Sequence, residues 1–201
     1  MNATEDLTRK TRVLLVRHGL PAGHLVLDPG LGTVGMEQAH RLATWLTWDA
    51  PAAVISSPYR RAYETAEIIA ERLGLTVQRN RDLREWSSGS THYVLPEKLA
   101  DTERGVAFAE GRFDDFVPPH DTGRLRSRMI GVVTQLGRDW PGGTVVAVSH
   151  GGAINNLLAH IIGGPSVFFV NPGYTSVSQI DVMPSGRLVV IIAISMSSIC
   201  S

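Results

Sequence analysis

The sequence predicts a single α/β domain. Apolar runs bounded by charged residues or glycine alternate with segments of helical period, which is typical of an α/β domain and not of a β-sandwich or a helical bundle. A chain of 201 residues lies in the usual range for one domain and can bury a sizeable core without cross-links. We therefore expect residues 1–201 to form one folding unit.

The apolar runs predict five strands. They are expected at residues 13–16, 53–55, 144–148, 176–182 and 187–194. The last two runs are joined by a short connection that contains Pro184, Ser185 and Gly186, so these two strands are expected to form an antiparallel hairpin.

Helices are predicted where apolar residues recur at spacings of three and four. This pattern occurs at about residues 39–46, 62–73, 125–136 and 154–161. The first helix is expected to begin near Thr33. The second follows Pro58 and is expected to end at Gly74, and the last is expected to end at Gly163.

The periodicity fades between Glu85 and Gly123, where glycine, proline, serine and histidine cluster. Long irregular segments inside a compact domain are often lids or binding segments. We therefore predict a lid or substrate-binding excursion at about residues 85–123.

Charge and composition argue against several partner classes. Lys plus Arg and Asp plus Glu both number 19, so no global field favours a nucleic acid or a membrane surface. The lone Cys200 cannot form an internal disulfide, the first ten residues contain no apolar run of signal-peptide length, and residues 188–194 are too few to span a bilayer. We expect a soluble, cytoplasmic protein, whose oligomeric state stays open and could be a homodimer.

Two of the expected strands end in a histidine. Arg17 and His18 follow the strand at 13–16, and His150 and Gly151 follow the strand at 144–148. Ligands bind outside the carboxyl ends of parallel strands, and a helix that begins after His150 would point free N–H groups into the same crevice. Either histidine alone could be a strand-end residue bonded by the backbone, but the pair indicates an anion site.

Arginines could supply the cationic groups that such a site needs. A phosphoryl group in transfer spreads negative charge over its oxygens and requires fixed donors and an in-line nucleophile. Arg17 lies beside His18, and Arg60 and Arg61 follow another strand-to-helix turn. Only one of that pair needs to point inward, since the other can be a solvated charge in the first helical turn.

Five segments of the chain resemble the histidine phosphatase superfamily, in its phosphoglycerate mutase-like branch. They are LLVRHG from Leu14, LGTVGMEQA from Leu31, SSPYRRAYETA from Ser56, LREWSSG from Leu83 and VSHGG from Val148. The resemblance covers nearly the whole chain and implies a three-layer α/β/α fold with a mostly parallel central sheet. Gly35 and Gln38 match the helix-opening part of the pattern and are expected to be structural.

The resemblance also implies the roles of the site residues. His18 would be the nucleophile that becomes phosphohistidine, and Arg17, Arg61 and His150 would complete the phosphate pocket, with Gly151 contributing at the start of its helix. Arg60 would then be the solvated member of its pair. Glu85 would be the proton donor, then the base that activates water. Without the resemblance, the sequence favours a loop carboxylate paired with Arg84 or Arg81 as the role of Glu85.

The chain departs from the family pattern directly after His18. Leu20 and Pro21 offer no side-chain donor, so a phosphate contact common in the family is missing there. His24 stands where the family has an asparagine that touches phosphate. Its imidazole could replace that amide as a phosphate ligand, or it could be an exposed loop histidine.

Local charge favours a phosphatase over a mutase. Residues 97–121 hold seven carboxylates against three cations, whereas a mutase needs a basic lid that retains two phosphates. We therefore expect hydrolysis of a small-molecule phosphate monoester with a neutral or cationic remainder. A mutase-like phosphotransferase and a phosphate-binding module with little turnover remain as alternatives.

A metal hydrolase is a further alternative, because His18, Glu85, His92 and His150 could in principle converge on zinc. No HExxH motif or paired-cysteine spacing supports it. The expected enzyme is therefore metal-independent and needs no cofactor.

Overall fold

The computed structural model describes residues 9–23, 26–85, 122–164, 170 and 172–194, together with positions 102, 103, 106, 107, 110 and 112. Most of the expected lid at 85–123, including His92, lies outside the described residues. His24 and Cys200 lie outside them as well.

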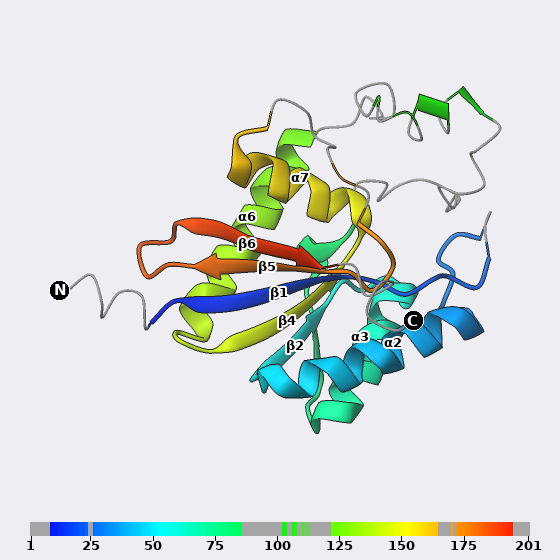
Figure 1. Cartoon of the computed structure of the whole chain (residues 1–201), viewed down its shortest axis with the longest axis horizontal. Coiled ribbons are helices and arrows are strands. Elements are labelled where there is room, and N and C mark those ends of the chain that lie inside the picture. The colour runs from blue at the N-terminus through cyan, green and yellow to red at the C-terminus, as the bar shows by residue number, and fades with distance from the viewer. Residues whose placement is uncertain are drawn as a thin grey trace.

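The described strands form one mixed sheet in the order β3-β2-β4-β1-β5-β6 (Figure 1). Their bounds are β1 (Thr11–Arg17), β2 (Ala53–Ser56), β3 (Val77–Arg79), β4 (Thr144–Ser149), β5 (Val177–Val182) and β6 (Leu188–Ile194). β3, β2, β4 and β1 run parallel, and β5 and β6 are an antiparallel hairpin added beside β1. The mostly parallel sheet and the closing hairpin are thus confirmed, while β3 was not predicted.

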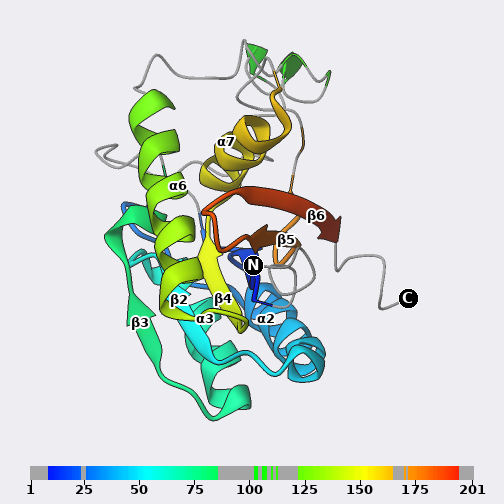
Figure 2. The same ribbon diagram turned by 90° about the vertical axis from the view of Figure 1, so that its left-hand side faces the viewer.

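Helices cover both faces of the sheet. The α-helices are α2 (Thr33–Leu46), α3 (Arg60–Leu73), α6 (Thr122–Asp139) and α7 (Gly151–Ile162), and the short 3₁₀ helices are η1 (Thr47–Asp49) and η2 (Arg81–Leu83). α6 and α7 lie on one face, and α2 and α3 lie on the other (Figure 2). The three-layer α/β/α arrangement is confirmed. Gly74 and Gly163 end their helices as predicted, each with a φ of 68° that a glycine adopts without strain.

The strands read as continuous apolar runs because both of their faces are buried. In β1, Val13 and Leu15 pack under α6 and α7, whereas Leu14 and Val16 pack against α2 and α3. β4 divides in the same way between the two cores. Since β1 and β4 are central and in register, with Arg17 opposite Ser149, their carboxyl ends meet at one edge of the sheet.

No helix of the described part is long and apolar enough to cross a membrane.

A close backbone contact fixes the loop that follows β1. A Cβ built on Gly35 would lie 2.1 Å from the carbonyl oxygen of Leu20, and a Cβ on Gly19 would lie 2.6 Å from the oxygen of Gly35. The Leu20 amide donates to Oε1 of Gln38 at 2.9 Å. The contacts of Gly35 and Gln38 agree with the structural role expected for them.

Replacing Gly35 by alanine is expected to destabilise the protein by about 1–3 kcal/mol, because the new methyl group collides with backbone that cannot move cheaply. Gly131 of α6 is the matched control, since a Cβ there meets nothing within 4 Å. Gly131→Ala should stabilise the protein by about 0.5–1 kcal/mol. Urea unfolding of both variants measures the difference, and shifts of the same sign would contradict the packing described for Gly35.

Candidate active site

His18 and His150 meet at the carboxyl edge of the sheet. The His18 amide donates to the oxygen of Ser149 at 3.1 Å, which continues the β1–β4 pairing past the strand ends. Their ring centroids are 5.1 Å apart with planes inclined at 60°, and both side chains are buried. The two strand-end histidines singled out in the sequence therefore belong to one site.

A backbone contact sets the tautomer of His18. Nδ1 lies 2.8 Å from the carbonyl oxygen of Gly19, so Nδ1–H donates to it. In the neutral ring this leaves the lone pair on Nε2, which accepts a hydrogen bond from Nε of Arg61 at 3.2 Å. The nitrogen with the lone pair thus faces the guanidinium group.

Both imidazoles are held in the neutral form. Burial lowers the pKa of His18 well below its usual value, and the charges of Arg61 and Arg17 lower it further. Burial likewise lowers the pKa of His150, with Arg61 the next contributor. An unprotonated His18 keeps its lone pair, as a nucleophile must.

These depressed pKa values make stability depend on pH. Below about pH 6.5 the unfolded chain protonates its histidines while buried His18 stays neutral, so the folded state loses stability as pH falls through this window. Each such group should cost about 1.4 kcal/mol per pH unit. Urea unfolding from pH 7.5 to 5.0 should show a flatter profile for His18→Asn than for the wild type. His40→Asn, at an exposed site on α2, should keep the wild-type slope, and equal slopes for all three proteins would refute the argument.

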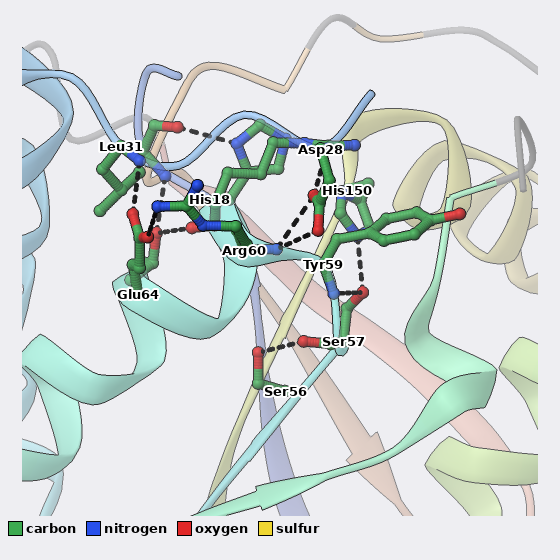
Figure 3. A network of polar contacts seen from close by, with 12 residues as sticks. His18, Asp28, Leu31, Ser56, Ser57, Tyr59, Arg60, Glu64 and His150 are labelled. Atoms are coloured by element: carbon green, nitrogen blue, oxygen red, sulfur yellow. Dashed lines mark hydrogen bonds and ion pairs between the residues drawn. The ribbon is translucent and has the colours of Figure 1, made fainter. Parts of the chain in front are cut away.

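Arg61 is the buried member of the arginine pair at the start of α3. Its side chain is 3% exposed, whereas that of Arg60 is 65% exposed and pairs with Glu64 at 3.0 Å. Nη1 of Arg61 also lies 3.6 Å from Oδ1 of Asp28, whose carboxylate accepts from the Arg60 amide (Figure 3). The structure thus places Arg61 inward and Arg60 in solvent, as the sequence analysis expected.

Arg17 is held by the segment that leads into β5. Its Nη1 donates to the oxygen of Pro172 at 2.5 Å, and its Cζ lies 3.9 Å above the ring of Tyr174. The Thr175 amide donates to the oxygen of Arg17 at 3.0 Å. Thr175 has a φ of 57°, a strained value for a β-branched residue.

His150 is oriented by a serine. Its Nε2 lies 2.8 Å from Oγ of Ser57, and Figure 3 shows this hydroxyl, which follows β2, directed at the ring. His150 Nδ1 and Arg17 Nε are buried nitrogens without a hydrogen-bond partner among the described residues. Both sit where a phosphate pocket is expected, beside His18.

Glu85 lies against the first turn of α7. It is 8% exposed, and its Oε2 accepts from the Gly152 amide at 3.0 Å. A Cβ on Gly152 would lie 2.8 Å from Oε1 of Glu85, and one on Gly151 would lie 3.4 Å from Nε of Arg17. The paired glycines let both side chains approach the helix, and the phosphate-binding role expected of Gly151 stays a prediction.

Several residues that support the site were not predicted from the sequence. Ser57, Tyr174 and the Pro172 carbonyl were not singled out, nor was Thr65, whose Oγ1 accepts from the Gly19 amide at 3.0 Å. A signal existed for Thr65, which lies one helical turn after Arg61 on the buried face of α3. Pro172 and Tyr174 lie in an irregular segment where no periodicity could reveal them.

The structure shows what Leu20 and Pro21 do at the positions where the chain departs from the family pattern. Pro21 forms an isolated bridge with Leu31, and the Gly32 amide donates to the oxygen of Leu20 at 3.0 Å. These residues therefore serve the loop's own pairing. Whether His24 binds phosphate stays a prediction, since it lies outside the described residues.

The described residues contain no group of three or more His, Cys, Asp or Glu side chains that could hold a metal ion.

Comparison with known proteins decides the family. Residues 13–194 match the model of the histidine phosphatase superfamily, branch 1. The chain belongs to the histidine phosphatase superfamily. This match confirms the resemblance drawn from the motifs. The relatives of this chain are named as phosphatases or as phosphoglycerate mutase-like proteins.

Three relatives of this histidine phosphatase domain illustrate the range. It is 33% identical to phosphoglycerate mutase-like protein 4 of Arabidopsis thaliana, over 72% of this chain and 68% of the relative. It is 31% identical to the uncharacterized phosphatase PhoE of Bacillus subtilis, over 77% and 79%. It is 30% identical to glucosyl-3-phosphoglycerate phosphatase of Mycobacterium tuberculosis, over 78% of each chain.

Solved structures agree with the histidine phosphatase fold. Mycobacterial hydrolase 1 superposes with a TM-score of 0.74 at 27% identity, over 92% of this chain and 98% of the other. The mycobacterial glucosyl-3-phosphoglycerate phosphatase superposes with a TM-score of 0.72 at 26% identity, over 90% and 97%.

Proposed function

We propose that this histidine phosphatase hydrolyses a small-molecule phosphate monoester through a phosphohistidine on His18, without a metal ion. One observation supports this above the others. Arg17 Nε and His150 Nδ1 are buried nitrogens with no protein partner among the described residues, next to a neutral imidazole whose lone pair faces Arg61. In the tautomer of His150 whose Nε2 accepts from the Ser57 hydroxyl, Nδ1 carries the proton, and it and the Nε–H of Arg17 can both donate to the oxygens of a phosphoryl group.

In the first step His18 attacks phosphorus. The Nε2 lone pair forms the N–P bond while the bond from phosphorus to the ester oxygen breaks. Arg61 then donates to a phosphoryl oxygen instead of to Nε2. Nδ1 of His18 keeps its proton and its bond to Gly19, and protonated Glu85 gives its proton to the leaving oxygen.

In the second step water hydrolyses the phosphoenzyme. Glu85, now a carboxylate, takes a proton from the water as its oxygen attacks phosphorus. The N–P bond breaks, its electron pair returns to Nε2, and inorganic phosphate leaves. One carboxyl group thus gives a proton to the leaving alcohol and regains one from water, and the enzyme returns to its starting state.

The relatives support hydrolysis, since PhoE and the mycobacterial protein are named as phosphatases. The acidic balance of residues 97–121 favours a monoester with a neutral or cationic remainder over a bisphosphate. We further propose that the chain forms one domain, acts in the cytoplasm, and binds a small molecule and not a nucleic acid or a membrane. A mutase-like phosphotransferase is the second candidate, favoured by the Arabidopsis relative's name.

Activity is expected to survive exhaustive chelation, with kcat changed by less than about twofold, because Arg17, Arg61 and His150 supply the cationic and donor groups. The measurement is phosphate release from a panel of phosphorylated metabolites before and after EDTA treatment. A zinc-dependent phosphatase treated in parallel shows that chelation was complete. Loss of activity that zinc or magnesium restores would favour the metal hydrolase instead.

A further inference from the structure

Glu85 lies in a segment that belongs neither to the sheet nor to a long helix. It follows the three-residue helix η2, and side chains from other elements hold the backbone carbonyls there. Oγ of Ser149 donates to the oxygen of Leu83 at 2.8 Å. The position of the Glu85 carboxyl group therefore depends on contacts far away in the sequence.

Arg128 of α6 makes two of these contacts. Its Nη1 donates to the oxygen of Asp82 at 2.5 Å, and its Nη2 donates to the oxygen of Glu85 at 3.2 Å. The planar guanidinium group thus bridges the turn, because it binds the carbonyl oxygens of Asp82 at the start of the turn and of Glu85 at its end. Arg128 is half-buried, so this clamp is partly shielded from water.

Electrostatics support the same pairing. Burial lowers the pKa of Arg128, and the negative charge of Glu85 opposes that effect, whereas Arg84 adds to it. Asp82 and Tyr59 also raise the pKa of Arg128, as Glu85 does.

The helix that presents Arg128 is fixed against α7. Nδ2 of Asn156 donates to the oxygen of Thr122 at 3.2 Å, and Nε of Arg126 donates to Oδ1 of Asn156 at 3.3 Å. Asn156 is fully buried one turn into α7, the helix whose Gly152 amide binds the Glu85 carboxylate. Arg128 of α6 thus holds the backbone of Glu85, and the Gly152 amide of α7 binds its carboxylate. Asn156 joins the two helices to each other.

We propose that Arg128 is a positioning residue that fixes Glu85 for proton transfer to the leaving group. The inference rests on the proposed role of Glu85. Proton transfer requires the carboxyl group within hydrogen-bond reach of the ester oxygen, and displacements of about 1 Å can cost on the order of 10²-fold in rate. Among the described residues Arg128 makes no hydrogen bond or ion pair with His18, His150, Arg17 or Arg61, and its charge lowers the pKa of His150 less than burial, Arg61 and His18 do, so its loss should largely spare the attack on phosphorus.

The test is Arg128→Met, which keeps the apolar stem and removes the fork. With an alkyl phosphate we expect kcat to fall by about 10–100-fold. With nitrophenyl phosphate the burst that reports phosphoenzyme formation should stay within about threefold of the wild type, since nitrophenolate leaves without a proton. In the Glu85→Gln background, Arg128→Met should have no further effect on the alkyl substrate.

Two controls keep the experiment decisive. Arg138→Met removes an exposed arginine from the far end of the same helix and should leave both substrates unaffected. Arg128→Lys keeps the charge but cannot donate to both carbonyl oxygens at once, so it should recover part of the loss in kcat on the alkyl phosphate. This variant can replace Arg128→Met in the test if Arg128→Met fails to fold.

Three outcomes would overturn the positioning role: equal losses in the rate of phosphoenzyme formation on both substrates, additive losses in the Glu85→Gln background, or a loss no larger than that of Arg138→Met. Wild-type protein that forms no phosphohistidine and releases no phosphate would instead refute the proposed function itself. The two failures are therefore distinguishable.

Discussion

Replacing His18 by asparagine is expected to lower kcat by about 10⁴–10⁶-fold, because the variant loses the atom that bonds to phosphorus. Asparagine retains a polar side chain of similar reach, so the packing beside Gly19 and Arg61 is largely kept. Mass spectrometry of wild-type protein quenched during turnover should find one phosphoryl group on His18, and His18→Asn should show none.

His150→Asn is the informative comparison for this experiment. His150 is equally buried at the end of the neighbouring strand, but its Nε2 is engaged with Ser57. That variant should bind and transfer phosphate poorly, yet still become phosphorylated on His18. Label on His150, or activity without any labelled histidine, would refute the assignment. Circular dichroism of both variants separates loss of chemistry from loss of fold.

Glu85→Gln is expected to have the second largest effect, and one that depends on the leaving group. Glutamine keeps the shape of the side chain and removes the titrating proton. With an alkyl phosphate, loss of general acid catalysis should slow phosphoryl transfer by about 10²–10⁴-fold. With nitrophenyl phosphate the first step needs no proton, so only hydrolysis of the phosphoenzyme should slow, and phosphohistidine should accumulate as a burst.

Rapid-quench kinetics on the two substrates measures this difference directly. Equal losses on both substrates, or none on either, would mean that Glu85 is structural and that the acid is another residue. Asp121 is then the next candidate, at the end of the acidic segment of residues 97–121.

Most of the fold could be predicted because the central strands are buried on both faces. β1 and β4 therefore appear as unbroken apolar runs, which a single sequence displays clearly. β3 could not be found in this way. It has three residues at the edge of the sheet, and Gln78 and Arg79 are exposed, so neither length nor alternation marks it.

The candidate site was predictable where its residues follow regular elements. His18 and His150 end strands, and Arg61 shares the buried face of α3 with Thr65. Choosing Arg61 over Arg60 nevertheless required the family resemblance, because adjacent helical residues point in different directions and both begin the helix. Tyr174, which stacks on Arg17, comes from a segment brought to β1 only by the antiparallel pairing of β5, a long-range contact that local patterns do not encode.

The separate attachment of Glu85 has a consequence for the design of new specificity. The groups proposed to hold the phosphoryl moiety extend from the rigid sheet edge and α3, whereas Glu85 extends from a turn fastened by Arg128, Ser149 and Gly152. Libraries that keep these three fastenings and diversify the chain beyond Glu85 should therefore yield variants with altered leaving-group preference and intact phosphoryl chemistry. Libraries that alter the fastenings should instead yield proteins that activated esters still phosphorylate on His18 but that release phosphate slowly.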